Sequence, residues 1–246
     1  MKISIITVCF NSQQTIKATI KSVLNQSYKQ IEYIIIDGAS TDNTIKIIKE
    51  FSNSIDVFVS EGDAGIYDAI NKGISKSSGD VVGLLHADDV FENNSVVGNV
   101  MRLFDENVDM IYGDINYVDR KDINRVIRRW KSDSYSKGKF KYGWMPPHTG
   151  FFIKKSCYTK YGLYNLSLGS SADYELMLRM FEVYNLKSKY IPLNITKMRV
   201  GGISNSSFKN RWEANRNDKK SWKINGLKPF WFTFLIKPII KIKQFF

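Results

Sequence analysis

Two adjacent carboxylates, Asp88 and Asp89, come just two residues after the apolar run at 81–85, in the stretch GLLHADD. Such neighbours repel each other unless a cation or strong hydrogen-bond donors lie beside them. Hard divalent cations such as Mg²⁺ and Mn²⁺ take carboxylate oxygens as ligands and share phosphate oxygens with a substrate. The pair therefore indicates a metal-bound diphosphate, a ligand that needs no glycine-rich loop.

Further acids follow two other strand-like runs. Asp37 closes the second such run of the chain, and Glu61 and Asp63 follow the third. In an open parallel sheet the carboxyl ends of the strands meet at one edge, and ligands bind there. A single acid at this place is usually a helix cap, which is our interpretation of Asp42 in STDNT. Acids after three successive strands instead predict a shared binding site.

These acids need a sheet to position them, and the N-terminal half alternates strand-like and helix-like segments. We expect strands at 2–10, 31–37, 55–60 and 79–87, and helices at 11–26, 38–51 and 65–77. This rhythm predicts an α/β fold of βαβ units, with a parallel sheet covered on both faces. Beyond residue 100 we expect strands at 108–118 and 151–155, a basic loop at 128–143 and an amphipathic helix at 172–184.

The composition limits the classes of partner. The chain has 246 residues with 36 Lys and Arg against 24 Asp and Glu, a formal charge of +12, which favours an anionic partner. Nucleic acid is disfavoured because the strand ends are acidic and the aromatic residues gather in the C-terminal tail. The chain has neither a G-x-G-x-x-G motif nor a P-loop, no apolar run of about 20 residues and no signal peptide. We therefore expect a cytoplasmic protein.

An ordered series of motifs resembles the family 2 glycosyltransferases, inverting nucleotide-sugar enzymes of GT-A fold. The matching stretches are SIITVCFN (4–11), IIIDGASTDNT (34–44), SEGDAGIYDAINKGI (60–74), GLLHADD (83–89), PHTGFFIKK (147–155), ADYELMLRM (172–180) and VGGIS (200–204). The resemblance covers residues 1–205 and looks like the subgroup found in bacterial O-antigen, capsule and exopolysaccharide gene sets. It implies a Rossmann-like, mostly parallel sheet and sugar transfer, expected from a UDP-sugar, to a hydroxyl of a glycan.

The resemblance also implies which residues bind the donor. Asp37 would accept a hydrogen bond from the base, and Asp88 would be the metal-binding acid of a D-x-D motif, with Mn²⁺ or Mg²⁺ as the cofactor. His86 stands at the first position of that motif, so its imidazole either hydrogen-bonds the ribose or phosphate or fills space. Asp89 is interpreted as structural. The implied nucleotide-sugar ligands are Thr7, Asn11, Asp37, Asp63, Lys72, His86, Ala87 and Asp88.

The resemblance implies Asp173 as the catalytic base, at the start of a helix, where an N-cap is the alternative interpretation. The commoner motif is Glu-Asp, but Ala172 precedes Asp173 here. His148 and Arg199 would lie near the acceptor or the diphosphate. Two other functions stay open: a metal-dependent nucleotidyltransferase or hydrolase, and a non-catalytic relative that binds a nucleotide-sugar.

The residues beyond the resemblance, 206–246, form a basic and aromatic extension that we expect to be helical. Its last part, NGLKPFWFTFLIKPIIKIKQFF, interleaves aromatic residues with lysines, as an interfacial membrane anchor does. The alternative is that it packs on the domain or forms a dimer contact, and the oligomeric state stays open. A membrane anchor would suit an acceptor glycan linked to a polyprenyl diphosphate at the inner face of the cell membrane.

Overall fold

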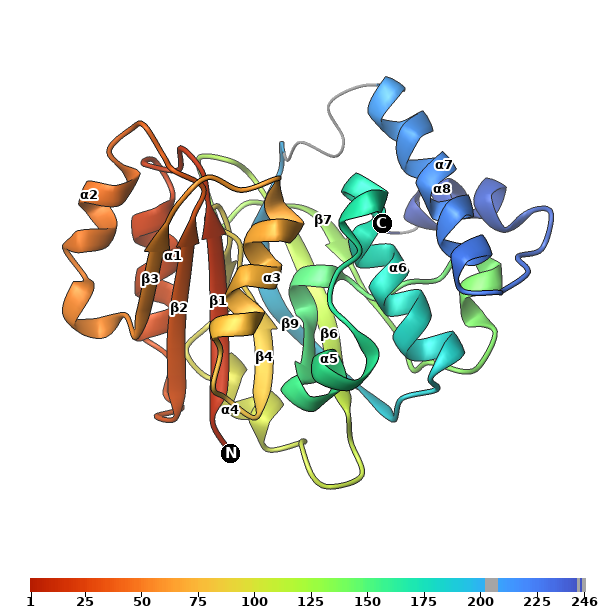
Figure 1. Ribbon diagram of the computed structural model, residues 1–246, viewed down its shortest axis with the longest axis horizontal. Coiled ribbons are helices and arrows are strands. Elements are labelled where there is room, and N and C mark those ends of the chain that lie inside the picture. The colour runs from red at the N-terminus through yellow and green to blue at the C-terminus, as the bar shows by residue number, and fades with distance from the viewer. Residues whose placement is uncertain (202–207, 243, 245–246) are drawn as a thin grey trace.

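The computed structural model describes residues 1–201, 208–242 and 244, and the described chain forms a nine-stranded sheet with helices on both faces (Figure 1). The strands are β1 (Ile3–Cys9), β2 (Ile31–Asp37), β3 (Val57–Ser60), β4 (Val81–Leu84), β5 (Val90–Phe91), β6 (Met110–Val118), β7 (Val126–Trp130), β8 (Phe151–Lys154) and β9 (Ser188–Arg199). Their order is β3-β2-β1-β4-β8-β6-β9-β5, and β7 pairs with β6. Strands β1 to β4 are parallel, as are β6 and β9, which confirms the predicted class.

The register of the first strands brings their carboxyl ends level. Cys9 pairs with Asp37, and Asp37 pairs with Ser60, so β1, β2 and β3 end at the same height. These ends lie at the top of Figure 1, and the amino terminus lies at the bottom. The acids that follow β2 and β3 therefore lie at one edge, as predicted, while Asp88 and Asp89 come after β4, whose last residue, Leu84, pairs with Ile6.

Two apolar cores, one on each face of the sheet, hold the helices in place. The helices are α1 (Ile16–Leu24), α2 (Thr44–Lys49), α3 (Ile66–Lys76), α4 (Val96–Met101), α5 (Lys155–Tyr161), α6 (Ala172–Leu178), α7 (Phe208–Ile224) and α8 (Thr233–Ile242). Ile16 and Ile20 of α1 are fully buried on one face, because their spacing puts them on one side of the helix. Ile70 and Ile74 of α3 are buried on the other face, together with α6.

The C-terminal extension forms α7 and α8, which pack on the rest of the chain. Trp222 is 1% exposed, and its indole N–H donates to the Tyr174 hydroxyl at 2.9 Å. Thr233 Oγ1 donates to the Lys141 carbonyl at 2.6 Å, and Phe234 is buried. None of the described helices has the length and apolar character needed to cross a bilayer.

Two predictions for the second half are wrong in detail. The expected loop at 128–143 contains the end of β7 and a 3₁₀ turn, Lys139–Tyr142. The run VIRRW pairs with β6 because β-branched and aromatic residues favour a strand, and its charges obscured that pattern. The expected helix at 172–184 changes after α6 into a π-helical turn, Arg179–Val183. The motif at 200–204 lies partly outside the described residues.

Candidate active site

An exposed aromatic ring and a carboxylate lie beside Gly38, just after β2. Phe10 follows β1 and is 62% exposed. A Cβ atom added to Gly38 would lie 2.5 Å from Asp63 Oδ2 and 3.6 Å from Phe10 Cδ2, so the carboxylate lies directly against the glycine. Asp63 Oδ1 accepts the backbone N–H of Gly65 at 2.8 Å, which orients the group. A flat apolar ring beside a carboxylate oxygen suits a planar base that carries an N–H donor.

Asp37 lies at the end of β2, but its carboxylate is fully buried and bonded within the protein. Asp37 Oδ2 accepts from the Ser40 N–H at 2.9 Å and from Ser60 Oγ at 2.7 Å. Asn11, with a φ of 48°, accepts the Thr41 N–H through Oδ1 at 2.9 Å. Both residues therefore shape the loop around Gly38, and neither side chain depends on a ligand for its hydrogen bonds.

Three more of the residues expected to bind the nucleotide have side chains that contact protein atoms. Thr7 is fully buried, and its hydroxyl lies 3.2 Å from that of Tyr33. Ala87 is buried as well. Lys72 Nζ lies 3.0 Å from a Glu61 carboxylate oxygen, which ties α3 to the loop after β3.

The two adjacent acids that follow β4, Asp88 and Asp89, face different surroundings. Asp89 is fully buried: Oδ1 accepts the Arg199 N–H at 3.2 Å, and Oδ2 has no hydrogen-bond partner among the described residues. Burial, followed by the charge of Asp88, raises the pKa of Asp89 well above its ordinary value. Asp88 is half-buried, so the carboxylate accessible to a ligand is that of Asp88.

Arg199, which was expected to meet a phosphate, is 9% exposed, and its guanidinium bonds to the protein. It donates to the Asp88 carbonyl and, at 3.2 Å, to the Arg120 carbonyl. Arg199 therefore fixes the loop that carries Asp88 between β9 and the segment after β6.

Asp173 is half-buried in the first turn of α6, after the N-cap residue Ser171, so capping does not account for it. Burial is the main cause that raises the pKa of Asp173 above its ordinary value. The Tyr174 N–H, 2.7 Å from Oδ1, and the positive charge of Lys237 in α8 oppose this rise, as does the Tyr67 hydroxyl. A carboxylate with a raised pKa is a stronger base than an ordinary one.

A cluster of rings joins Asp173 to the two histidines. Tyr67, whose hydroxyl lowers the pKa of Asp173, stacks on Tyr164 with ring centroids 5.4 Å apart. The Tyr164 hydroxyl lies 2.9 Å from His148 Nε2, and the His148 and His86 rings are 5.8 Å apart. Burial lowers the pKa of each histidine to about 4, so both are neutral at pH 7. The structure thus brings together three predicted site residues, His86, His148 and Asp173, which lie up to 87 positions apart in the sequence.

The residues at Asp88 fit a divalent cation that is shared with a substrate. Within the described part of the chain, no three His, Cys, Asp or Glu side chains converge on a point where they could hold a metal alone. Mg²⁺ commonly binds through one or two carboxylates and completes its shell with water and substrate phosphates. The accessible Asp88 and the neutral imidazole of His86 match that kind of site.

Three residues that lie at the candidate site were not predicted from the sequence: Phe10, Tyr67 and Tyr164. A signal existed for the first two, because Phe10 lies in the first motif, SIITVCFN, and Tyr67 lies in GIYDA, within the third. Tyr164 lies in no motif, so only the fold reveals its place.

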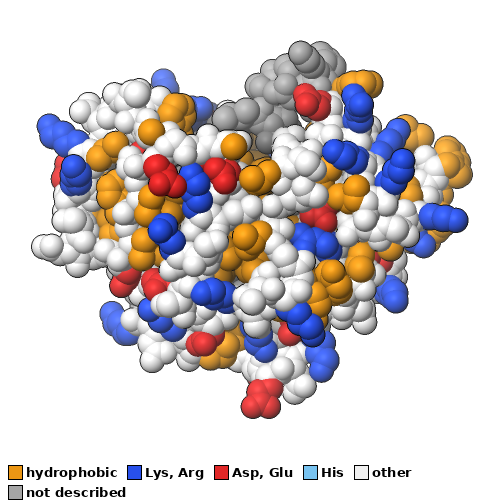
Figure 2. Space-filling view, viewed as in Figure 1, with side chains coloured by type: hydrophobic (Ala, Val, Ile, Leu, Met, Phe, Trp, Pro, Cys, Tyr) orange, Lys and Arg blue, Asp and Glu red, His pale blue; other side chains and the backbone are white. Residues whose placement is uncertain are grey.

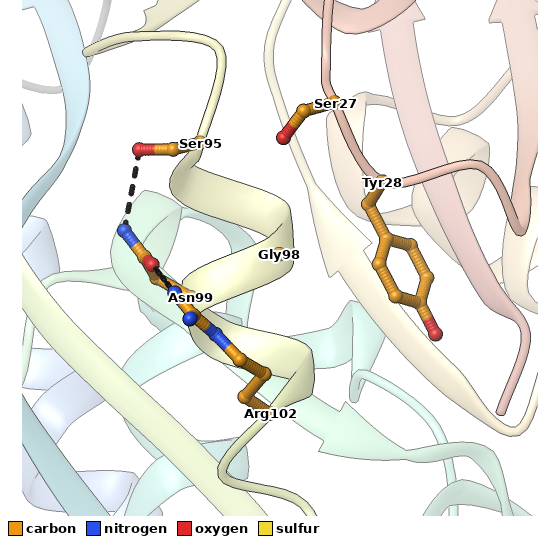
Figure 3. Close-up of a pocket in the computed structure, with 6 residues that line it drawn as sticks. All are labelled: Ser27, Tyr28, Ser95, Gly98, Asn99 and Arg102. Carbon is orange, nitrogen blue, oxygen red and sulfur yellow. Dashed lines mark hydrogen bonds between the residues drawn. The ribbon is translucent and has the colours of Figure 1, made fainter.

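A hollow elsewhere on the surface is not part of this site. Figure 3 shows it between α4 and the segment that precedes β2. Helix α4 lies at the bottom of Figure 1, far from the carboxyl ends of β1 to β3. The hollow is lined by Ser27, Tyr28, Ser95, Gly98, Asn99 and Arg102.

Comparison with known proteins identifies the family. The model of glycosyl transferase family 2 matches residues 4–163. The uncharacterized glycosyltransferase Rv1514c of Mycobacterium tuberculosis is 34% identical over 188 residues, which cover 72% of this chain and 68% of that one. The Escherichia coli UDP-Glc:alpha-D-GlcNAc-diphosphoundecaprenol beta-1,3-glucosyltransferase WfgD is 31% identical over 122 residues, about half of each chain (49% and 48%).

Solved structures show the same fold at low identity. Staphylococcus aureus TarS 1-349 in complex with UDP-GlcNAc has a TM-score of 0.69 at 16% sequence identity. The match covers 90% of this chain and 66% of the TarS chain, so this chain spans slightly less than two thirds of TarS 1-349. The mannosyltransferase PcManGT of Pyrobaculum calidifontis, in complex with GDP-Man and Mn²⁺, has a TM-score of 0.65 at 16% identity, over 99% and 69%. The chain therefore has the GT-A fold and belongs to glycosyltransferase family 2.

Proposed function

We propose that this enzyme moves a sugar from a UDP-sugar to a hydroxyl of a lipid-linked glycan, with inversion, during assembly of a bacterial surface polysaccharide. The proposal is supported by three groups of suitable chemistry: the Phe10 and Asp63 pair beside Gly38, the accessible Asp88 after β4, and the carboxylate of Asp173. A base, a diphosphate and an acceptor hydroxyl would each find a chemically suitable partner among them.

The donor half of the proposal rests on Phe10 and Asp63. Uracil would stack on the Phe10 ring and donate its N3–H to Asp63 Oδ2, whereas cytosine has an acceptor at that position. The diphosphate would then extend toward Asp88. A divalent cation held there by Asp88 would offset the charge that builds up on the leaving diphosphate.

The transfer half rests on Asp173. Its carboxylate takes the proton of the acceptor hydroxyl as that oxygen bonds to the anomeric carbon, and the bond from that carbon to the diphosphate oxygen breaks on the opposite face. The configuration at the anomeric carbon therefore inverts. The Tyr67 hydroxyl favours the ionised form of the carboxylate, and the neutral His148 can bind a sugar hydroxyl without competing for the proton.

A nucleotide screen followed by turnover tests this function. Thermal unfolding is measured with UDP, GDP and CDP, each with and without Mn²⁺, and the protein is then incubated with UDP-glucose or UDP-N-acetylglucosamine to follow release of UDP. We expect UDP with Mn²⁺ to stabilise the fold most, and slow release of UDP to water. A protein that none of the diphosphates stabilises would contradict the proposal, and preference for GDP would move it to a guanosine donor.

Association with a membrane surface is supported by the outer side of α8 and the turn before it. Trp231 is 85% exposed, Leu235 is 61% exposed and Phe230 is 38% exposed, with Lys228 close by in sequence. Apolar and basic side chains also mix on the right of Figure 2, where α7 and α8 lie. Rings and lysines together suit anionic headgroups.

The membrane test uses point variants, because removing the whole tail would also remove Lys237 from beside Asp173. We expect the wild type to sediment with phosphatidylglycerol vesicles but not with phosphatidylcholine vesicles. The double variant Trp231→Ser, Leu235→Ser should stay in the supernatant with an unchanged unfolding temperature. Equal sedimentation of the variant and the wild type would rule out this surface.

A further inference from the structure

Tyr164 and His148 form a hydrogen-bonded pair that joins two separate loops of the chain. The Tyr164 hydroxyl lies 2.9 Å from His148 Nε2, and the two rings meet edge to face with centroids 5.6 Å apart. Tyr164 is 3% exposed, whereas His148 is half-buried. Because Nε2 is engaged, Nδ1 is the ring nitrogen left for a ligand, and within the described part of the chain it has no hydrogen-bond partner. A sugar hydroxyl suits this nitrogen in either tautomer, since a hydroxyl both donates and accepts.

The Tyr164 side of the pair is held firmly by the protein. Asn71 of α3 accepts the Tyr164 N–H through Oδ1 at 3.0 Å and donates through Nδ2 to the Tyr164 carbonyl at 2.9 Å. Arg179 donates to the carbonyls of the three preceding residues, 161–163. The Tyr164 ring also stacks on Tyr67. Tyr164 is thus fixed by hydrogen bonds and by packing, as a residue that orients another side chain has to be.

The backbone on the His148 side is fixed as well. His148 begins a 3₁₀ turn, His148–Gly150, between β8 and the segment before it. The Thr149 carbonyl of this turn accepts from Thr196 Oγ1 of β9 at 2.8 Å. The turn therefore rests on the sheet, and the freedom left to the imidazole is rotation about its own side-chain bonds. The bond to Tyr164 restricts that rotation and sets where Nδ1 points.

His148 lies between the residues that we propose for the diphosphate and for the base. Its ring centroid is 5.8 Å from that of His86, two positions before Asp88, and 6.3 Å from that of Tyr67, whose hydroxyl lowers the pKa of Asp173. In an inverting transfer the acceptor oxygen attacks the anomeric carbon on the side away from the diphosphate. The transferred sugar therefore has to lie between Asp88 and Asp173, which is where His148 stands.

We propose that Tyr164 is a positioning residue, which holds the His148 ring so that His148 Nδ1 binds a hydroxyl of the transferred sugar. This inference rests on the proposed function, because it takes Asp88 and Asp173 as the two ends of the reacting centre. Asn71 contributes by anchoring the backbone of Tyr164. The bond to the sugar would hold the donor in one orientation toward the attacking oxygen, which favours transfer.

The test compares ligands that differ only by the transferred sugar. Affinities for UDP, UDP-glucose and UDP-N-acetylglucosamine, each with Mn²⁺, are measured by isothermal titration for the wild type and for Tyr164→Phe, which loses one hydroxyl and keeps the ring. We expect the UDP-sugar that the wild type binds more tightly to lose about three- to ten-fold in affinity, as loss of a neutral hydrogen bond does. The affinity for UDP should stay within about two-fold of the wild type.

Two further variants identify the cause. Tyr184→Phe is the matched control, because it removes the same atom from a tyrosine that is 42% exposed and stacks on Tyr161, and it should leave every affinity unchanged. His148→Phe should weaken the same UDP-sugar at least as much as Tyr164→Phe does. In that background Tyr164→Phe should add almost nothing, since its hydroxyl acts through the imidazole, whereas a merely structural hydroxyl would give losses that add.

Several results would overturn the inference. They are an unchanged affinity of Tyr164→Phe for both UDP-sugars, an equal loss for UDP, which would place His148 at the diphosphate, and losses of Tyr164→Phe and His148→Phe that add in full. A wild type that binds UDP but neither UDP-sugar would also overturn it. If Tyr164→Phe has a lowered unfolding temperature, Asn71→Ala replaces it, and absence of the same selective loss there would again overturn the inference.

The proposed function fails by a different result. A wild type that binds no UDP refutes the donor assignment itself, so UDP is titrated first. A wild type that binds UDP, with variants that behave like it, refutes only the role of Tyr164 and His148.

Discussion

Placing a methyl group on Gly38 tests whether Asp63 binds the base. A Cβ atom there would lie 2.5 Å from Asp63 Oδ2, whereas an ordinary contact begins at 3.4 Å. The carboxylate oxygen therefore has to move by about 0.9 Å, which would stretch a hydrogen bond of about 2.9 Å to a length at which it no longer counts as one. Gly38→Ala should thus remove the bond from Asp63 to the base without removing any ligand group.

The size of the effect follows from the kind of bond. A hydrogen bond to a charged group contributes about 1.5–3 kcal/mol, which corresponds to about a ten- to hundred-fold loss of affinity for UDP. Isothermal titration with UDP measures this loss. The affinity for inorganic pyrophosphate should stay the same, because the contacts of the diphosphate are elsewhere.

A double-mutant cycle isolates the cause. Asp63→Ala should lose about as much affinity as Gly38→Ala, and Gly38→Ala should cost almost nothing more once Asp63 is gone, since the added methyl group then meets no carboxylate. If Gly38→Ala binds UDP like the wild type, or if the two losses add in full, Asp63 does not bind the base, and the reasoning about this pocket is refuted.

Three other variants address the base and the tail. Asp173→Asn should lower kcat by about 10²–10⁴-fold while UDP affinity stays within about two-fold, and a kcat near that of the wild type would exclude Asp173 as the base. Only ionised Asp173 accepts a proton, so transfer should fall as the pH drops through its raised pKa. Lys237→Gln removes a charge that lowers this pKa, so the acid limb of kcat/KM should move to higher pH, whereas Lys228→Gln, at an exposed site, should leave it in place. Trp222→Ala should lower the free energy of unfolding by about 3–5 kcal/mol in urea titrations, and an unchanged midpoint would mean that α7 is not part of the folded core.

The parallel sheet and its acid edge could be predicted because apolar periodicity and strand ends are local signals. The runs at 31–37 and 55–60 became β2 and β3 with little change in bounds. The basic run that contains β7 was misread, because its pairing with β6 is a contact between distant parts of the chain and its charges resemble those of a loop. Local composition carries no information about such pairing.

Site residues were located better than they were oriented. Asp37 and Arg199 were placed at the correct edge, yet a motif does not say whether a side chain faces a ligand or the protein. Asp37 is bonded to Ser40 and Ser60, and Arg199 is bonded to backbone carbonyls. Asp63 shows the reverse case, since only the three-dimensional position of Gly38 reveals where its free oxygen points.

The C-terminal extension packs beside Asp173, the residue that we propose as the base. Lys237 Nζ lies 2.5 Å from Asp218 Oδ2 and 3.7 Å from the centroid of the Tyr174 ring. Tyr174 is the residue that follows Asp173 in the chain. The residues that set the charge around the base therefore come from α6, α7 and α8 together. A membrane that pulled on the outer side of α8 would act on Lys237, and so on the proton affinity of Asp173, through one rigid helix. If the proposals for the base and for the membrane surface both hold, the packing of α8 would couple the two.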